Sequence, residues 1–288
     1  MTLNDQIARR LDEVADLLAE QGANVFRVQA YRRGAETVRH LKRPVSEIFE
    51  REGMEGLREL PGVGDRLAVA IRNLVTLGRL PMLDRMRGET DPVELFQSVL
   101  GIGPVQAARL HDELGLDSLE DLEAAAHDGR LENVAGFGHK RVAGIIDALA
   151  TRLGRVRPPS PPSADHAPVE ELLDVDREYR ESAAAGTLRT IAPHRFNPNG
   201  EAWLPILHTE RGGRHYTALF SNSARANKLG KTRDWVVLYY DGQHGENQFT
   251  VITSQFGPLK GRRIVRGREE ECARYYDKPV AALEEVAR

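Results

Sequence analysis

A short Pro-Gly-x-Gly segment, Pro61-Gly62-Val63-Gly64, constrains the fold of this chain more than any other stretch. Apolar residues at helical spacing flank it on both sides, so it is expected to join the end of one helix to the start of another. Proline and glycine bend the backbone tightly, and glycine leaves neighbouring N–H groups uncovered by side chains. Because these N–H groups lie at the positive end of the following helix, the segment predicts a cradle for phosphate.

The same turn recurs twice further along the chain. One copy is Leu100-Gly101-Ile102-Gly103-Pro104, and a looser one is Ala135-Gly136-Phe137-Gly138-His139-Lys140. A single Gly-x-Gly turn between helices is usually only a turn, but three copies favour a helix-hairpin-helix repeat. That module grips the nucleic-acid backbone without reading its sequence. A purely structural third hairpin remains an open alternative.

The length and composition are typical of a soluble protein with more than one domain. With 288 residues, 41% hydrophobic and 29% charged, the chain is long enough for two or three soluble globular domains. It has no apolar run long enough to span a membrane, and Met1–Arg10 lacks the apolar core of a signal peptide. A single cysteine, Cys272, excludes a disulfide framework and a thiolate metal site. We therefore expect a cytoplasmic protein that does not contact the membrane.

The net charge of −3 argues against a generic polycation, so any surface for nucleic acid must be local. Three basic stretches are candidates: Arg27, Arg32, Arg33, Arg39, Lys42 and Arg43; Arg211, Arg214, Arg225, Lys228, Lys231 and Arg233; and Lys260, Arg262, Arg263, Arg266 and Arg268. A solvated protein face is the alternative for each of them.

Hydrophobic periodicity divides the chain into a helical half and a mixed half. Short helices are expected at 4–20, 25–41, 45–49, 54–60, 65–77, 105–114, 118–126 and 141–153, with Asn4 and Ser118 as N-caps. Strands are expected at 203–210, 216–221, 235–240, 248–253 and 262–265, with helices at 169–185, 222–229 and 269–276. The predicted fold is multi-domain, with an all-α helix-hairpin-helix N-terminal half and a small antiparallel α+β C-terminal domain.

Several motifs in a fixed order then give a specific resemblance. They are Asn24-Val25-Phe26-Arg27-Val28-Gln29-Ala30-Tyr31-Arg32-Arg33, Leu60-Pro61-Gly62-Val63-Gly64, Thr76-Leu77-Gly78-Arg79-Leu80, Leu100-Gly101-Ile102-Gly103-Pro104 and Leu114-Gly115-Leu116-Asp117-Ser118-Leu119-Glu120-Asp121-Leu122. Over residues 4–153 the chain resembles family X DNA polymerases, the polymerase beta group and its bacterial relatives. The resemblance implies a small helical domain at 1–88 with the first hairpin, which binds the 5′-phosphate side of a DNA gap. The second and third hairpins then occupy 89–155. Five prolines predict a linker at 156–168, and residues 169–288 form an accessory α+β domain whose family is not recognised.

The resemblance also implies site residues. Arg27, Tyr31 and Arg66 fall where the family places its 5′-phosphate ligands. The further phosphate-binding residues, mostly through backbone N–H groups, are Gly62, Gly64, Gly101, Gly103, Val105, Gln106, Gly136, Gly138 and Lys140. A sodium or potassium ion is implied on the backbone carbonyls of Arg58, Leu60 and Val63, and on those of Gln97, Val99 and Ile102. No other cofactor is expected.

Two departures from the family bear on catalysis. Ala70 stands where lyase-active relatives carry the lysine that forms a Schiff base, and alanine is no nucleophile. The chain has no Gly-Ser turn followed by the Asp-x-Asp pair that holds two magnesium ions in the polymerase site. Its one Asp-x-Asp, Asp174-Val175-Asp176, lies in a helical run where i and i+2 diverge, and we interpret it as a solvated helix face. We therefore expect neither polymerase nor lyase activity.

The C-terminal half leaves more than one function open. Its aromatic residues would form a single-strand platform or fill the core: Trp203, Tyr216, Phe220, Trp235, Tyr239, Tyr240 and Phe256. A nuclease or phosphoesterase site is the rival, with His208, His215, Asp234, Asp241, His244 and Glu246 as its only candidates.

The sequence as a whole predicts a non-sequence-specific DNA-binding protein for gapped, nicked or branched DNA in repair or recombination, with repair proteins as further partners. The alternatives are an enzyme with its site in the C-terminal domain, and a protein–protein adaptor in which the hairpins only stack helices.

Overall fold

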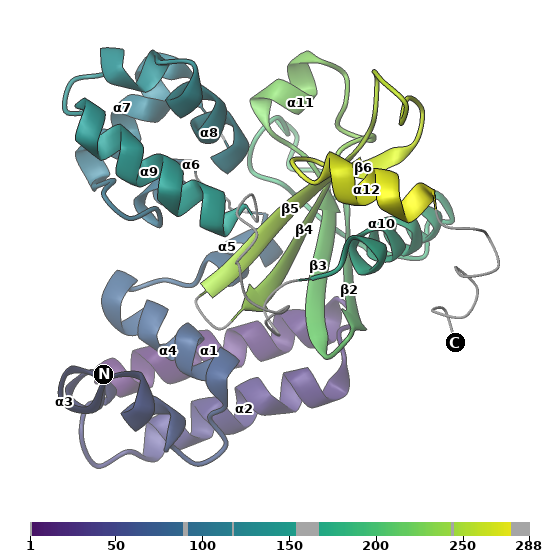
Figure 1. The fold of residues 1–288 in the computed structure, drawn as a ribbon. Coiled ribbons are helices and arrows are strands. Elements are labelled where there is room, and N and C mark those ends of the chain that lie inside the picture. The colour runs from purple at the N-terminus through teal and green to yellow at the C-terminus, as the bar shows by residue number, and fades with distance from the viewer. Residues whose placement is uncertain (1, 89–91, 117, 154–166, 243–244, 278–288) are drawn as a thin grey trace. The chain divides into compact units, whose positions relative to one another are not determined.

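The computed structural model describes residues 2–88, 92–116, 118–153, 167–242 and 245–277 (Figure 1). The chain forms two compact units, each assembled from three segments. Unit 1 comprises Met1–Thr90, Thr187–Thr217 and Tyr240–Glu246, and unit 2 comprises Asp91–Gly186, Ala218–Tyr239 and Asn247–Arg288. No described helix is long and apolar enough to cross a membrane.

The helices of unit 1 come from the first 88 residues. They are α1 (Leu3–Glu20), α2 (Val25–His40), α3 (Val45–Arg58), α4 (Asp65–Leu77) and α5 (Pro81–Met86). Helix α1 packs along α2, with Leu11, Val14 and Leu18 fully buried between them. The predicted break between helices at 45–49 and 54–60 is a kink within α3, where Gly53 has φ 64° and ψ −148°. Helix α4 has the predicted bounds and ends at Gly78 in the left-handed conformation.

The predicted N-cap Asn4 is wrong. The cap of α1 is Thr2, whose hydroxyl accepts the Asp5 N–H (3.1 Å) while the Asp5 carboxylate accepts the Thr2 N–H (2.8 Å). Asn4 is buried inside the helix, where its amide accepts the Val45 N–H and donates to the Arg43 carbonyl. A polar residue that would suit a cap instead connects α1 to the start of α3.

The first four helices of unit 2 are α6 (Pro92–Gln97), α7 (Pro104–Leu114), α8 (Leu119–His127) and α9 (His139–Arg152), with a 3-10 turn at Arg130–Asn133. They enclose their own core, which includes Phe96, Ile102, Leu110 and Phe137. Ser118 is confirmed as the N-cap of α8, because its hydroxyl accepts the Asp121 N–H (3.1 Å). This is the all-helical arrangement that the sequence predicts for the N-terminal half.

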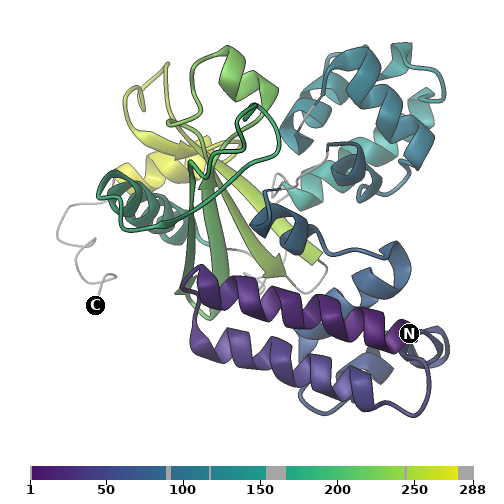
Figure 2. The same cartoon turned by 180° about the vertical axis from the view of Figure 1, so that it is seen from behind.

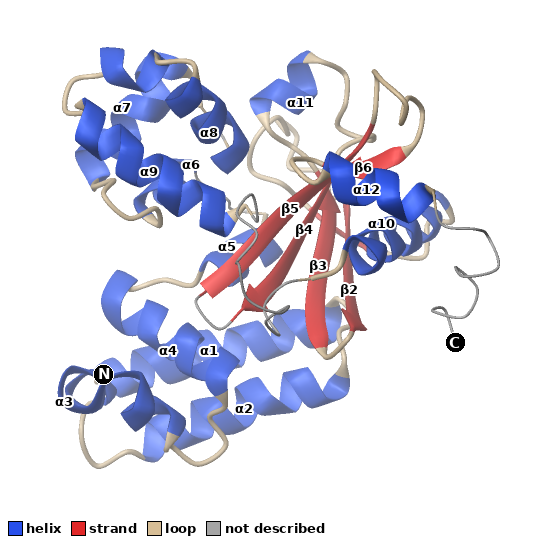
Figure 3. Ribbon diagram, viewed as in Figure 1, coloured by secondary structure: helices blue, strands red, loops and turns tan. Residues whose placement is uncertain are grey.

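The C-terminal half contains one six-stranded sheet with the strands in chain order (Figure 3). The strands are β1 (Arg189–Ile191), β2 (Leu204–Arg211), β3 (Arg214–Phe220), β4 (Val236–Gly242), β5 (Gly245–Thr253) and β6 (Arg263–Val265). The remaining helices are α10 (Val169–Ala184), α11 (Ala224–Lys228) and α12 (Glu269–Tyr276). Both α10 and α12 contact β6, and they contact each other. These elements confirm the predicted α+β class, although the three-residue strand β1 was not predicted, since it is too short to show an alternating pattern.

The compact units combine segments from both sides of the predicted boundary at residue 168: unit 1 joins residues 1–90 to 187–217 and 240–246, and unit 2 joins 91–186 to 218–239 and 247–288. Within unit 1, His208 on β2 contacts Gln21 at the end of α1. Within unit 2, the buried carboxylate of Glu120 on α8 accepts the Gln248 amide (2.9 Å) and the Thr250 hydroxyl from β5. Each helical region is therefore joined to part of the sheet. Most of the predicted linker, residues 154–166, lies outside the described residues.

Candidate nucleic-acid interface

The three glycine turns share one backbone geometry. In each, the first glycine lies in the left-handed region, with φ 75° at Gly62, 91° at Gly101 and 97° at Gly136. Only glycine adopts this conformation without a steric cost from Cβ. A buried apolar residue follows and closes the turn with its N–H: Val63 donates to Leu60 (3.0 Å), Ile102 to Val99 (3.1 Å) and Phe137 to Val134 (3.1 Å). We call these turns 1, 2 and 3.

The second glycine of turns 1 and 2 begins a helix without a side-chain cap. Gly64 and Gly103 are the N-caps of α4 and α7, with φ −88° and −89°, and neither makes a side-chain cap hydrogen bond. Any residue adopts such angles. A Cβ at Gly64 would meet no atom within 4 Å, and one at Gly103 would meet only the end of the flexible Gln106 side chain. The backbone therefore does not require glycine here, and its effect is to leave the first N–H groups of the helix approachable.

Turns 2 and 3 lie next to each other in unit 2. Arg109 on α7 donates to the Ala135 carbonyl of turn 3 (2.8 Å), and Arg141 on α9 donates to the Gly136 carbonyl. The first turns of α7 and α9 contain no acidic residue. Turn 3 therefore lies beside α7, with Arg109 and Arg141 bonded to its carbonyls. Arg109 and Arg141 were not predicted; an arginine within two turns of the second glycine is the signal that could have identified them.

Turn 1 has the same backbone in different surroundings. Asp65 occupies the first turn of α4 and pairs with Arg58 (2.6 Å). Arg66, which is half-buried, donates to the Gly213 carbonyl in the β2–β3 hairpin of unit 1. Arg33 is exposed, and its Cβ lies 3.7 Å from the position of a Cβ on Gly62. Arg33 is therefore an exposed cation beside turn 1 that was not among the predicted phosphate ligands.

The other two residues predicted to bind the 5′-phosphate lie below the surface. Arg27 and Tyr31 are each 7% exposed, and the Arg27 guanidinium contacts the Met82 sulfur (3.0 Å). Ala70 is buried one helical turn after Arg66. The 5′-phosphate role of these residues stays a prediction, and it would require the side chains of Arg27 and Tyr31 to be uncovered.

The N-terminal basic stretch is largely neutralised by acids from other elements. Arg32 pairs with Asp16 (3.3 Å), Arg39 with Asp12, and Arg43 with Glu52 (2.6 Å). The sequence shows only Glu36 within this stretch, because the compensating acids come from α1 and α3. Such exposed pairs add little stability, but they lower the local positive potential.

The carbonyls predicted to hold a monovalent ion include those of Leu60 and Val99, which also accept the N–H that closes turns 1 and 2. A carbonyl oxygen has a second lone pair, so the turn bond is compatible with an ion ligand. The ion sites on Arg58, Leu60 and Val63, and on Gln97, Val99 and Ile102, stay predictions.

The interpretation of Asp176 as a solvated residue is wrong. Asp176 is 1% exposed and forms a bidentate ion pair with Arg263, at 2.6 and 2.9 Å. Burial raises the pKa of its carboxyl, against the opposing effect of Arg263. Only its neighbour Asp174 lies at the surface of α10, where it pairs with Arg177. The i and i+2 positions do diverge, as predicted, but one of them points into the core.

The candidates for a C-terminal enzyme site are dispersed. His208 contacts Thr217 and Gln21, and burial lowers the pKa of its imidazole to about 3. Asp234 bonds to Arg263, Glu246 to Arg85 and His215 to Glu210. His244 and the side chain of Asp241 lie outside the described residues. The part of the chain that the structure describes contains no group of three His, Cys, Asp or Glu residues able to hold a metal ion.

Two of the seven aromatic residues considered for a single-strand platform lie in the core instead. Tyr216 and Tyr240 are buried, with ring centroids 5.3 Å apart, and Phe220 packs edge-on against Tyr179. Trp203, Trp235 and Tyr239 are half-buried. Phe256 alone among the seven is strongly exposed, at 86%. Tyr216 and Tyr240 therefore fill the core, as the alternative interpretation holds.

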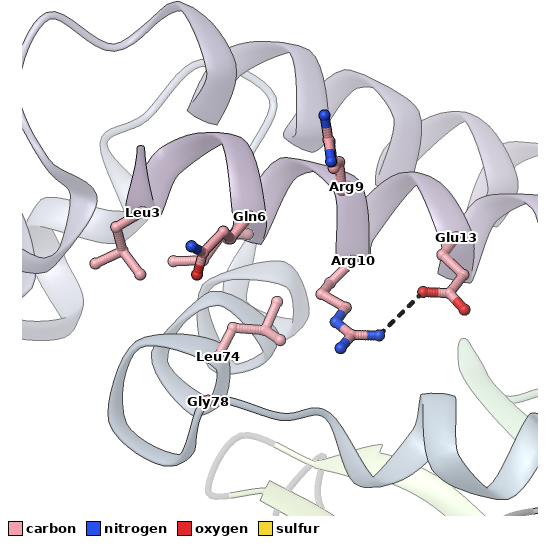
Figure 4. Close-up of a pocket in the computed structure, with 8 residues that line it drawn as sticks. Leu3, Gln6, Arg9, Arg10, Glu13, Leu74 and Gly78 are labelled. Carbon is pink, nitrogen blue, oxygen red and sulfur yellow. Dashed lines mark hydrogen bonds and ion pairs between the residues drawn. The ribbon is translucent and has the colours of Figure 1, made fainter. Parts of the chain in front are cut away.

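Figure 4 shows an open groove between α1 and the end of α4. Leu3 and Arg10 line it from α1, and Leu74 and Gly78 line it from α4 and its cap. Arg10 is paired with Glu13 one turn along α1 (3.3 Å). None of the predicted phosphate ligands is among the described residues that line this groove, so we do not assign it a role.

Comparisons with known proteins match both helical regions. A helix-hairpin-helix domain model matches residues 2–80, and a model of the SAM-like helix-hairpin-helix tandem matches residues 93–151. The DNA polymerase/3'-5' exonuclease PolX of Bacillus subtilis is 28% identical over 144 residues, which are 50% of this chain and 24% of that protein. The N-terminal half is related to family X DNA polymerases.

Two eukaryotic members of family X also match. DNA polymerase lambda of Arabidopsis thaliana is 37% identical over 118 residues, 39% of this chain and 20% of its own. DNA polymerase lambda of Rattus norvegicus is 28% identical over 222 residues, 76% of this chain and 34% of its own. The chain therefore spans about a third or less of the length of these relatives. The tandem model covers turns 2 and 3, which are the two turns that contact each other.

Proposed function

We propose that this protein binds the DNA backbone at gaps, nicks or branches, without reading base sequence, and acts in repair or recombination. The observation that carries the proposal is the shared geometry of the three turns, in which a helix starts beside a left-handed glycine. The relationship of the N-terminal half to DNA polymerases supports DNA as the ligand.

The binding energy would come from backbone amides and nearby cations. A helix N-terminus has the effect of about half a positive charge and presents unpaired N–H groups. Turns 2 and 3 combine two such ends with Arg109, Arg141 and the exposed Lys140. Contacts of this kind go to phosphate, so affinity should fall steeply with salt and vary little with sequence.

We propose that the protein does this without polymerase or lyase chemistry. Alanine at position 70 supplies no amine for a Schiff base, and the one Asp-x-Asp has its second carboxylate bound to Arg263. Borohydride trapping on an incised abasic site should give no adduct, and an adduct within residues 1–155 would overturn this part.

We further propose that the hairpins hold Na+ or K+, that repair proteins are partners, and that the protein acts in the cytoplasm.

The central test compares DNA structures by fluorescence anisotropy across a series of salt concentrations. The full chain is titrated into gapped, nicked, four-way and intact duplexes of the same sequence. We expect tighter binding to the interrupted duplexes, with affinity that decreases as salt rises. Equally weak binding to gapped and intact duplex would remove the gap-recognition claim. Absence of binding at low salt would favour the adaptor alternative.

A further inference from the structure

Two loops of unit 2 meet at one end of the sheet. Because neighbouring strands are antiparallel, the β3–β4 connection (221–235) and the β5–β6 connection (254–262) leave the sheet at the same end. Figures 1 and 2 both show α11 beside the β5–β6 loop there. The Thr253 hydroxyl donates to the Asp234 carboxylate (2.6 Å), which ties the bases of the two loops together. We call residues 221–235 and 254–262 the cationic end.

The cationic end carries six basic residues and one acidic residue. The basic residues are Arg225, Lys228, Lys231, Arg233, Lys260 and Arg262. The acid, Asp234, is already bonded to Arg263 (2.8 Å) and lies 3.9 Å from Lys231. Lys228, Arg233 and Lys260 are exposed. In a protein with a net charge of −3, this concentration of positive charge is local, and it favours a polyanion as ligand.

Two exposed apolar side chains accompany these cations. Phe256 is 86% exposed in the β5–β6 loop, and Leu229 is 53% exposed just after α11. Gly257 and Gly261, with φ 68° and 81°, bend the loop on the C-terminal side of Phe256. An aromatic ring held among Lys and Arg is the combination that binds unpaired bases, because every base can stack on a ring while its phosphate pairs with a cation.

We propose that the cationic end binds a single-stranded segment of DNA, with one base stacked on Phe256 and the phosphates on Lys228, Arg233 and Lys260. The inference rests on the proposed function and deepens it, since a gap or a branch exposes unpaired bases. In this proposal the turns bind phosphates of the duplex, whereas the cationic end binds the unpaired strand. Intact duplex offers Phe256 no accessible base.

The test uses the full chain and two probes, a single strand containing 2-aminopurine and an intact duplex of the same length. Phe256→Ala removes the stacking ring, and its control is Phe196→Ala, an aromatic that is 49% exposed on another loop. The triple variant Lys228→Ala, Arg233→Ala and Lys260→Ala removes the charges. Its control removes three exposed cations of unit 1 that lie outside the three basic stretches, Arg9→Ala, Arg51→Ala and Arg189→Ala.

We expect Phe256→Ala to weaken single-strand binding about ten-fold and to abolish the 2-aminopurine signal, with duplex affinity changed less than about two-fold. The triple variant should lower the slope of log affinity against log salt by about 2 for the single strand. Both controls should behave as the wild type. Stronger binding of an RNA strand of the same sequence would overturn the assignment to DNA.

The two proposals fail in different ways. If the cationic-end variants match their controls while Gly103→Asp abolishes duplex binding, this inference is wrong and the role of the turns stands. If Gly103→Asp has no effect while Phe256→Ala weakens single-strand binding, the turns are not the duplex site and the inference stands. If no oligonucleotide binds at low salt, both are overturned.

Discussion

Turn 1 and the pair formed by turns 2 and 3 have nearly the same backbone and very different surroundings. In turn 1 the helix end already faces the carboxylate of Asp65, and Arg66 is bonded to the Gly213 carbonyl. In turns 2 and 3 no acid occupies the first helical turn. If the turns bind phosphate as proposed, the shared backbone geometry suits all three, and the neighbouring side chains should decide which turn binds most strongly. We expect turns 2 and 3 to supply most of the affinity for DNA.

The largest expected effect separates the two N-cap glycines. Gly103→Asp should weaken duplex binding about 10- to 100-fold, because the new carboxylate accepts the helical N–H groups and repels phosphate. Gly64→Asp should weaken it less than about three-fold. Aspartate is a good N-cap, so neither melting temperature should fall. Equal losses of affinity in the two variants would contradict the claim that turn 2 contributes more to DNA binding than turn 1.

A fall in pH should selectively lower the stability of unit 1, which contains turn 1 and His208. The pKa of His208 is lowered to about 3 in the folded protein, whereas an unfolded histidine takes up a proton near pH 6.5. The stability that depends on neutral His208 is therefore present above pH 6.5 and is lost as the pH falls toward 3. At about pH 5.5 the loss should be about 1.4 kcal/mol, absent in His208→Gln.

Urea unfolding of the wild type, His208→Gln and the control His194→Gln at about pH 7.5 and pH 5.5 measures this difference. His194 is exposed, so its variant should follow the wild type. The same pH dependence in all three proteins would contradict the assignment to His208.

A smaller effect should follow from removing the acid of turn 1. Asp65→Asn takes a negative charge from the positive end of α4 and should raise DNA affinity about 2- to 5-fold at low salt. The gain should shrink as salt screens the exposed charge. Asp112→Asn, near the opposite end of α7, is the matched control. Unchanged affinity in Asp65→Asn would mean that turn 1 does not approach phosphate at all.

The smallest expected effect concerns Arg66. Since its guanidinium is already bonded to the Gly213 carbonyl, Arg66→Ala should change affinity less than about two-fold. Arg33→Ala, which removes the exposed cation beside Gly62, should cost about 2- to 3-fold. Anisotropy titrations on gapped duplex measure both variants. A larger loss for Arg66→Ala would restore Arg66 as the phosphate ligand that the resemblance implies.

Local features of the fold were predictable from the sequence, and contacts between distant segments were not. Pro-Gly-x-Gly fixes its own turn through the φ of Gly62, and the bounds of α4 and α12 follow from apolar spacing and flanking glycines. The burial of Arg27, however, depends on Met82, which lies on another helix. The pairing of Asp176 with Arg263 joins residues 87 positions apart. Hydrophobic periodicity predicts which face of a helix is apolar, but it does not predict which residues of other elements pack against that face.

The assembly of each compact unit from distant segments of the chain bears on how the protein unfolds. Unit 1 joins its N-terminal helices to residues 187–217 and 240–246, so segments from both halves of the chain belong to one folded unit. A chain cut before Val169 would lack the strands that belong to unit 1. We accordingly expect the helices and the strands of each unit to lose structure together on heating.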